Sequence, residues 1–266
     1  RPAFARSSAP SPERRRATRR LFAHDRGSGH ARVAGADEAG RGCLAGPLVA
    51  AAVLLDLEGL TRHARLALSG LDDSKRLRPA ERERLGAAIT LHAACVSVIV
   101  ISPRTIDAVG LHVANIDALS RALAGLDGGY DHAWVDGFGL GEEAPRHERL
   151  VGGDRRSAAV AAAGVMAKTT RDRLMRGPVA ESCPGYGFEA HVGYGTAEHL
   201  RALADLGPSP AHRRCFRPVA YTELALFVDE ASGGGIDIDQ TVGLEGDAWP
   251  PAGSVDDREA QADRDR

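Results

Sequence analysis

Two short apolar runs joined by a glycine-rich turn constrain the fold of this chain more than any other feature. Residues 33–36 and 48–55 are apolar and bounded by Gly and Pro, which is typical of buried strands. The turn between them, residues 40–45, fits the letter of a dinucleotide-binding loop. Such a loop opens a helix, whereas Pro47 and the apolar run after it favour a second strand. We therefore predict two strands joined by a tight turn.

Further strands and helices alternate along the rest of the chain. The additional strands are expected over residues 95–101, 133–135 and 149–151. Helices are expected over residues 79–93, 112–126 and 157–175. The first begins with a proline in its first turn, the second repeats apolar side chains every three or four residues, and the third has a serine cap. This order predicts an α/β domain with a mixed sheet.

Length and composition predict one domain with tails. The chain has 266 residues, of which 43% are hydrophobic, enough for a sizeable core. Residues 1–30 are rich in Arg, Ser and Pro, and residues 231–266 are rich in Gly, Asp and Pro. We expect a disordered basic arm over residues 1–30, a folded domain over residues 31–222 and an acidic, disordered tail over residues 223–266. Such an arm can add weak, salt-sensitive attraction to nucleic acid.

Several classes of protein and site are disfavoured. The longest mainly apolar run, residues 43–55, is shorter than the roughly 20 residues that span a bilayer, and no apolar run follows the N-terminal arginines. The four cysteines form no CxxC pair, and His112, His191, His199 and His212 share no ligand spacing. We expect a cytoplasmic protein without a membrane segment, a disulfide framework or a zinc site.

Four acidic side chains stand at the ends of expected elements. Asp37 and Glu38 close the first strand, Asp136 closes another, and Asp154 precedes the long third helix. If these ends meet, the repulsion between the carboxylates requires cations to offset it. Oxygen ligands favour Mg²⁺ or Mn²⁺, and a pair of such ions supports phosphodiester hydrolysis. Because neighbours in a regular strand face opposite sides, either the strand is irregular at Asp37 and Glu38, or one of them acts through its carbonyl or an outer-shell water.

Seven segments within residues 32–220 together resemble the prokaryotic ribonuclease HII family. They are VAGADEAGRGCLAGPLVAAAVLL, LDDSKRL, GLHVANIDALSRAL, WVDGF, GGDRRSAAVAAAGVMAKTTRDRLM, YGFEAHVGYGT and PSPAHRRCFRPV. The resemblance implies a ribonuclease H-like, mixed five-stranded sheet flanked by helices, with a small C-terminal helical part. It also implies that Asp37, Glu38, Asp136 and Asp154 bind Mn²⁺ or Mg²⁺ and carry catalysis.

The same resemblance implies a substrate and a way to recognise it. The expected enzyme is an endoribonuclease that hydrolyses the RNA strand of RNA/DNA hybrids and cuts 5′ of ribonucleotides embedded in duplex DNA, leaving 3′-hydroxyl and 5′-phosphate ends. Gly40, Arg41 and Gly42 would sense the ribose 2′-hydroxyl, which distinguishes RNA from DNA. Tyr194 would stack on the sugar of the next nucleotide. No obligatory protein partner is implied, so we expect a monomer.

The chain departs from the family pattern at three positions. Val192 stands where a lysine is common, and Gly164 and Cys215 stand where serines are common. Without that lysine, one contact with the substrate backbone is open to question. The four acids and the Gly-Arg-Gly are intact, so an active enzyme is expected.

Only two of the 34 Lys and Arg residues are lysines, Lys75 and Lys168. A lysine ammonium acts on phosphate as a point charge, unlike the planar fork of arginine. We therefore assign both lysines to phosphate binding or to the acid cluster. Arg171 and Asp172 are expected to form a local structural pair.

Two alternative functions remain open at this stage. Another metal-dependent nuclease on the same fold would use the four acids without needing a 2′-hydroxyl. A non-catalytic nucleic-acid binding module is disfavoured, because clustered acids repel phosphate unless cations are present.

Overall fold

Five strands form one mixed sheet in the computed structural model, which describes residues 10–222 and 224. The strand order is β3-β2-β1-β4-β5. The strands are β1 (Arg32–Ala39), β2 (Leu48–Asp56), β3 (Cys95–Ile101), β4 (His132–Asp136) and β5 (Glu148–Leu150). β2 is antiparallel to both β1 and β3, whereas β4 is parallel to both β1 and β5. The predicted mixed five-stranded sheet is confirmed.

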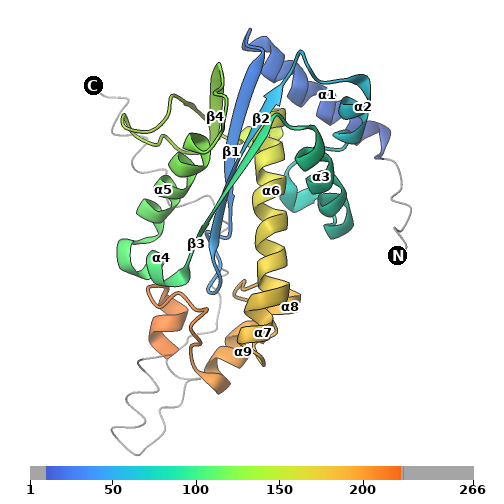
Figure 1. The fold of residues 1–266 in the computed structure, drawn as a ribbon. Coiled ribbons are helices and arrows are strands. Elements are labelled where there is room, and N and C mark those ends of the chain that lie inside the picture. The colour runs from blue at the N-terminus through green and yellow to red at the C-terminus, as the bar shows by residue number, and fades with distance from the viewer. Residues whose placement is uncertain (1–9, 223, 225–266) are drawn as a thin grey trace, which may run out of the picture.

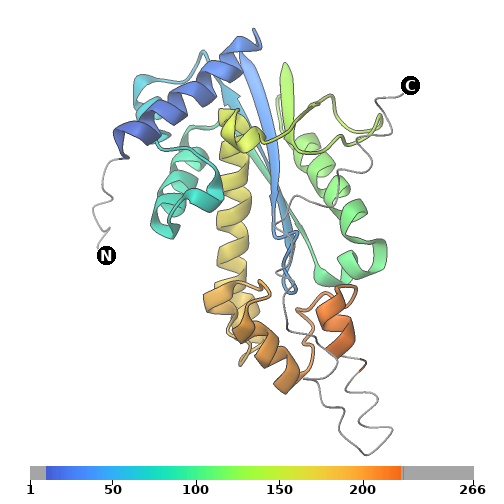
Figure 2. The same cartoon turned by 180° about the vertical axis from the view of Figure 1, so that it is seen from behind.

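Helices cover both faces of this sheet (Figures 1 and 2). The α-helices are α1 (Pro12–Gly27), α2 (Arg62–Ala67), α3 (Pro79–His92), α4 (Pro103–Val109), α5 (Leu111–Ala124), α6 (Ala158–Leu174), α7 (Ala180–Ser182), α8 (Phe188–His191) and α9 (Ala197–Leu206). Three short helical turns are η1 (Ser74–Arg76), η2 (Gly153–Arg155) and η3 (Met175–Val179). One face carries α6 with α3 and α1, and the other carries α5 and α4 (Figure 1). No helix within the described residues is both long and apolar enough to cross a bilayer.

The long helix α6 packs unusually close to the centre of the sheet. Its first turns are rich in alanine and completely buried, and they contact β1 and β2. Gly35 of β1 makes this approach possible, since a Cβ atom there would overlap with the main chain of Ala159. Ser157 caps the helix as predicted, its Oγ accepting a hydrogen bond from the main-chain N of Val160 at 3.2 Å. This packing places the middle of α6 directly behind the end of β1.

The prediction of a disordered arm over residues 1–30 is wrong for residues 12–27, which form α1. Ser11 caps the helix, and Leu21 and Phe22 are buried in the core beneath it. Asp25 is also completely buried, and its Oδ2 accepts a hydrogen bond from the main-chain N of Ala159 at the start of α6. Arginine-rich composition obscured the apolar face, because long charged side chains occupy the remaining positions of an amphipathic helix.

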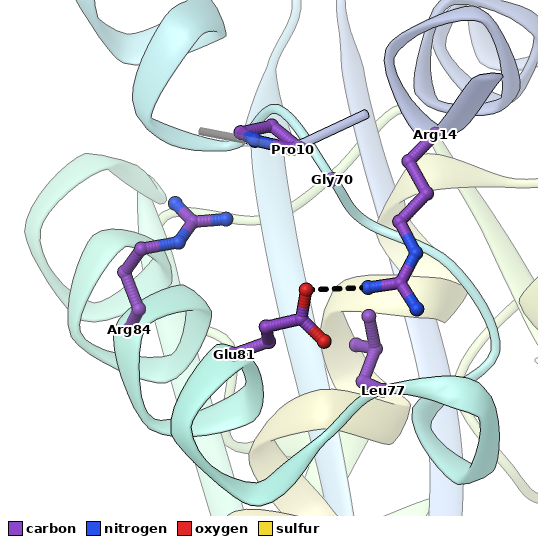
Figure 3. A pocket seen from close by; sticks show the side chains of 6 residues that line it. All are labelled: Pro10, Arg14, Gly70, Leu77, Glu81 and Arg84. Carbon is purple, nitrogen blue, oxygen red and sulfur yellow. Dashed lines mark ion pairs between the residues drawn. The ribbon is translucent and has the colours of Figure 1, made fainter. Parts of the chain in front are cut away.

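Contacts with α3 also hold α1 in place. Figure 3 shows Arg14 of α1 and Glu81 of α3 beside Leu77, and their Nη1 and Oε1 atoms are 2.6 Å apart. Hydrogen bonds from Arg78 and Arg14 lower the pKa of Glu81 to about 2. Residues 1–9 and the acidic tail predicted over residues 223–266 lie outside the described residues, apart from Leu224.

A small helical part follows α6 at the end of the sheet where β1 turns into β2 (Figure 1). It comprises α7, α8, α9 and a helical segment over residues 217–222. The chain turns into it through η3, where Gly177 has non-helical dihedrals (φ −102°, ψ −105°) and Pro178 follows. Tyr186 and Phe188 lie in its own apolar cluster. The predicted C-terminal helical part is therefore confirmed, and it lies next to the glycine turn.

Candidate active site

The two adjacent acids at the end of β1 point to opposite faces of the sheet. Asp37 and Glu38 both continue the regular β1–β2 ladder. Asp37 faces α6, where a Cβ atom on Gly164 would overlap with its carboxylate. Glu38 faces the other side, with its Oε1 3.9 Å from Nε of Arg41. The strand is therefore regular, so the first of the two expected ways for Asp37 and Glu38 to act together is wrong.

The other two acids reach the same end of the sheet from β4 and η2. Asp136 lies beside Asp37, because β1 and β4 pair in parallel up to the residues before them. Oδ1 of Asp136 accepts a hydrogen bond from the main-chain N of Gly153 at 2.7 Å. That bond ties η2, and with it Asp154, to the end of β4. Three separate elements thus bring the four predicted acids together.

Burial and mutual repulsion raise the pKa of these carboxyl groups. Burial, followed by the charges of Glu38, Asp136 and Asp154, raises the pKa of Asp37 well above its usual value. Burial raises the pKa of Glu38 to about 7 against the opposing effect of Arg41, and Asp136 adds to the rise. Burial, followed by Asp73 and Asp136, raises the pKa of Asp154 to about 6. Burial also raises the pKa of Asp136.

Two residues of η1 and its cap complete the charge distribution. Asp73 raises the pKa of both Asp136 and Asp154, so it belongs to the acidic cluster although it was not predicted there. Lys75 lowers the pKa of Glu38, Asp136 and Asp154. The segment LDDSKRL contained both residues, but the sequence could not show that η1 faces the end of β4. The structure places Lys75 in electrostatic range of the acids.

The four acids form no ready-made cation cage. Within residues 10–222 and 224, no three His, Cys, Asp or Glu side chains are arranged to hold a metal ion. Two of the acids contact neighbouring groups of the protein. Oδ1 of Asp37 accepts a hydrogen bond from the main-chain N of Glu38 at 2.7 Å, and Oδ1 of Asp154 lies 3.8 Å from Nε of Arg155. However, buried Oε2 of Glu38 has no hydrogen-bond partner among the described residues, and a cation would satisfy it. The oxygen donors of the four acids suit a hard divalent cation, although their side chains are not yet arranged around a common point among the described residues.

The two glycines of the turn beside the acids differ in the space around them: a side chain would not fit at Gly40 but would fit at Gly42. Gly40 has φ +97°, and a Cβ atom there would overlap with the side chain of Arg171. At Gly42, a Cβ atom would meet no described atom within 4 Å apart from its chain neighbours. The Arg41 guanidinium lies 4.6 Å from the ring centre of Phe138. No contact within the described protein therefore requires glycine at position 42.

Buried Arg171 fixes this turn from behind. Its Nε donates to the carbonyl of Pro47, Nη1 to that of Val192, and Nη2 to that of Ala45, at 2.9–3.0 Å. Asp172 has separate partners, Lys168 at 2.7 Å and Arg82 at 3.1 Å. Both residues make structural contacts as expected, but each with its own partners. The expectation that they form a pair with each other is not met.

Tyr194 lies next to the glycine turn. The carbonyl of Gly193 accepts hydrogen bonds from the main-chain N of Leu44 and of Ala45. Tyr194 is 39% exposed, and burial together with Cys43 raises the pKa of its hydroxyl to about 12. Nζ of Lys168 lies 5.1 Å from the centre of its ring. Lys168 therefore lies beside Tyr194 and Asp172, whereas Lys75 lies near the four acids.

The three departures from the family pattern have different surroundings. Val192 is buried and left-handed (φ 46°), and its carbonyl accepts from Arg171. Gly164 leaves space for the carboxylate of Asp37. Cys215 is exposed, and its main-chain N donates to Oδ1 of Asp107. Among them, Gly164 alone contacts a predicted catalytic acid.

Comparison with solved structures defines the class of fold to which this chain belongs. The ribonuclease H2 of Pyrococcus horikoshii OT3 superposes with a TM-score of 0.63 and 24% sequence identity, over 73% of this chain and 97% of that chain. Bst-RNase HIII, solved in complex with Mn²⁺, superposes with a TM-score of 0.60 and 18% identity, over 83% of this chain and 76% of that chain. The chain therefore has the fold of these two ribonucleases H.

Sequence comparison identifies the family within that class. The model of the ribonuclease HII family matches residues 34–221. The ribonuclease HII of Chloroflexus aurantiacus is 47% identical over 199 residues, which cover 74% of this chain and 92% of that protein. This chain belongs to the ribonuclease HII family, as its sequence segments predicted, and it is an enzyme of the ribonuclease H type.

Proposed function

We propose that this enzyme hydrolyses the RNA strand of RNA/DNA hybrids and cuts 5′ of ribonucleotides embedded in duplex DNA, leaving 3′-hydroxyl and 5′-phosphate ends. One observation carries the proposal: four carboxyl groups with raised pKa meet beside the glycine turn, and Gly42 of that turn has space around it for a ligand. Family membership supports the ribonuclease activity. The proposed enzyme acts as a monomer in the cytoplasm, with no obligatory protein partner.

In this proposal Asp37, Glu38, Asp136 and Asp154 hold Mn²⁺ or Mg²⁺. When bound, a pair of such ions activates the attacking water and stabilises the leaving oxygen of a phosphodiester. Three features support this role: the oxygen-only donor set, the unpaired Oε2 of Glu38 and the raised pKa of all four groups. The Mn²⁺ complex of Bst-RNase HIII belongs to a protein of the same fold.

The remaining residues bind and orient the substrate. Gly42 lets a ribose approach the main chain closely enough for its 2′-hydroxyl to be recognised, while Gly40 holds the turn and Arg41 borders it. Tyr194 presents an exposed ring for stacking on the next sugar. Lys75 and Lys168 offer point charges to phosphates, one beside the acids and one beside Tyr194.

Replacing Asp136 by asparagine tests the metal role directly. The oxygen of the introduced amide can still accept the hydrogen bond from Gly153, so the fold should be retained, as measured by circular dichroism. Cleavage of a duplex with one ribonucleotide should fall by about a thousandfold or more, because a neutral amide is a poor ligand for hard cations. A matched control is Asp131→Asn, at the opposite end of β4, where Oδ2 accepts from the main-chain N of Arg32. Near-normal activity of the folded Asp136→Asn variant would refute the assigned role.

A further inference from the structure

Three buried histidines lie behind Tyr194, apart from the acidic cluster. His199, His212 and His191 are 0%, 2% and 8% exposed, respectively. The rings of His191 and His199 stack with their centres 4.5 Å apart, and Phe188 meets His199 edge-on at 5.3 Å. Burying three titratable rings is costly unless their polar atoms are paired. Their hydrogen bonds therefore show what the cluster holds in place.

Two of the rings form a continuous hydrogen-bonded chain that ends on Tyr194. Nδ1 of His199 lies 2.8 Å from the carbonyl oxygen of Tyr194, and its Nε2 lies 3.0 Å from Nε2 of His212. Nδ1 of His212 lies 3.0 Å from the main-chain N of Ser209 and 2.9 Å from the Oγ of the same residue. The chain thus runs from one main-chain group to another through two imidazoles.

The two ends of this chain determine where its protons lie. The carbonyl of Tyr194 can only accept, so Nδ1 of His199 carries a proton and its Nε2 is free to accept. The main-chain N of Ser209 can only donate, and the Ser209 hydroxyl can also donate, so Nδ1 of His212 accepts and its proton is on Nε2. His212 therefore donates to His199, and His199 donates to Tyr194. We assign these protons from the partners, and every contact in the chain is satisfied only when both rings are neutral.

The segment around His212 is in turn bonded to the glycine turn. Ala45 and His212 form an isolated antiparallel β-bridge. The main-chain N of Arg213 donates to the carbonyl of Leu44 at 2.9 Å, and its Nη1 donates to the carbonyl of Arg41 at 3.0 Å. The histidine pair therefore links the main chain of Tyr194 to the turn that carries Arg41, in addition to the direct bonds from Leu44 and Ala45 to the carbonyl of Gly193.

We propose that His199 and His212 act as a neutral hydrogen-bonded pair that fixes Tyr194 relative to the glycine turn, which makes both histidines positioning residues for recognition of the substrate sugar. This inference rests on the proposed function, because it requires Tyr194 to contact substrate. The carbonyl of Tyr194 also accepts from the main-chain N of Thr196, which belongs to the same short loop. The bond from His199 is the one that connects this carbonyl to the segment bonded to the turn.

Two substitutions of His199 separate its two hydrogen bonds. Asparagine carries an amide nitrogen at about the distance of Nδ1 from the main chain and can still donate to Tyr194. Glutamine reaches toward His212 and lacks that donor. Either change breaks the chain from Tyr194 to His212, so on a duplex with one ribonucleotide both variants should lower kcat/KM by about tenfold, mainly through KM. His63→Gln, at an exposed histidine of α2, is the matched control. Normal kcat/KM in a folded variant of either kind, His199→Gln or His199→Asn, would overturn the inference.

Combining the change with Tyr194→Ala separates this inference from the proposed function. If Tyr194→Ala alone leaves cleavage unchanged, the proposed role of Tyr194 is wrong, and the positioning role is wrong with it. If Tyr194→Ala lowers kcat/KM, the double variant His199→Gln/Tyr194→Ala should be no worse than Tyr194→Ala, because both changes remove the same interaction. The positioning role alone would be overturned if the losses in kcat/KM of the two single variants multiplied in the double variant. It would also be overturned by a folded His199→Gln variant with normal kcat/KM.

A spectroscopic measurement on the unaltered protein keeps the proposal testable even if a variant fails to fold. Imidazole ¹⁵N chemical shifts at pH 7.5 should show neutral rings, with the proton on Nδ1 of His199 and on Nε2 of His212. The opposite tautomer at either ring, or a protonated cation, would contradict the pair.

Discussion

Asp37 and Gly164 share one space between β1 and α6: the carboxylate of Asp37 lies where a side chain on Gly164 would begin. In that position Oδ1 of Asp37 accepts a hydrogen bond from the main-chain N of Glu38. The absence of a side chain in the middle of α6 therefore allows this acid to turn toward the helix. The relationship makes Gly164 a determinant of how the four acids face one another.

We expect Gly164→Ser to increase the affinity for divalent cations. A Cβ atom would exclude the carboxylate from the space beside α6 and leave the orientations that face the other acids, so less reorganisation is needed on binding. The expected result is a Kd for Mn²⁺ that is lower by about threefold, measured by isothermal titration calorimetry.

Gly86→Ser provides a matched control for that prediction. Gly86 also lies inside a helix, α3, but a Cβ atom there would make only an ordinary contact with Thr169 at 3.6 Å. Both substitutions should gain a few tenths of a kcal/mol in helix propensity, yet only the change at Gly164 should alter Mn²⁺ binding. Weaker binding by the Gly164→Ser variant would show that the turned position of Asp37 is the one that serves the cation.

The raised pKa of Glu38 predicts a pH-dependent gain in stability when this acid is neutralised. Its pKa is about 7 in the folded protein, against 4.5 as its ordinary value. Ionising it in the folded state therefore costs free energy that the unfolded chain does not lose, and the cost grows as pH rises from about 4.5 to about 7. Without cations, the free energy of unfolding of Glu38→Gln relative to wild type should rise through this window by about 3 kcal/mol.

Comparing the variant with wild type at each pH is necessary, because His212 acts in the opposite direction. Burial lowers the pKa of His212 to about 4, so its contribution to stability is lost as pH falls from about 6.5 toward 4. That loss is the same in both proteins and cancels in the difference. Urea unfolding of both proteins at several pH values measures the difference in their free energies of unfolding. If that difference stays constant from pH 4.5 to 7.5, the pKa of Glu38 is not raised.

Asp25 should be the main polar anchor of α1. Its completely buried carboxylate accepts from the main-chain N of Ala159, and a hydrogen bond with Ser157 lowers its pKa against the larger effect of burial. Asp25→Ala would leave that N–H unpaired and should reduce the free energy of unfolding by about 2 kcal/mol. Glu13→Ala, an exposed acid in the first turn of the same helix, should change it by less than about 0.5 kcal/mol. Equal effects in urea unfolding would argue against the anchor.

Local sequence patterns predicted the sheet well where a strand is a short apolar run with clear ends, as in β2 and β3. β3 occupies the predicted residues 95–101. β1 and β2 extend beyond the predicted 33–36 and 48–55, because pairing between neighbouring strands carries β1 through Asp37 and Glu38. Those two acids looked like the end of a strand, whereas the ladder makes them part of it.

Features that depend on tertiary contacts were not predictable from local pattern. α1 was missed because its two buried apolar residues stand among arginines. Asp73 joins the acids only because η1 folds against the end of β4. His199 and His212 have no informative spacing, and they meet because α9 and the following loop pack together. Ser11 and Pro12 are a local start signal for α1, whereas nothing in the local sequence indicated that Asp73, His199 and His212 would meet their partners.

The central claim is that the four acids and the glycine turn form one site that cuts only where a 2′-hydroxyl is present. The most direct test is cleavage of an end-labelled DNA duplex with one ribonucleotide, beside the identical all-DNA duplex, in Mg²⁺, in Mn²⁺ and in EDTA. We predict one cut on the 5′ side of the ribonucleotide, leaving a 3′-hydroxyl, in either cation, and none in EDTA or in the all-DNA duplex. Equal cleavage of both duplexes, as expected of a nuclease on this fold that does not read the sugar, or cleavage that persists in EDTA, would contradict the account.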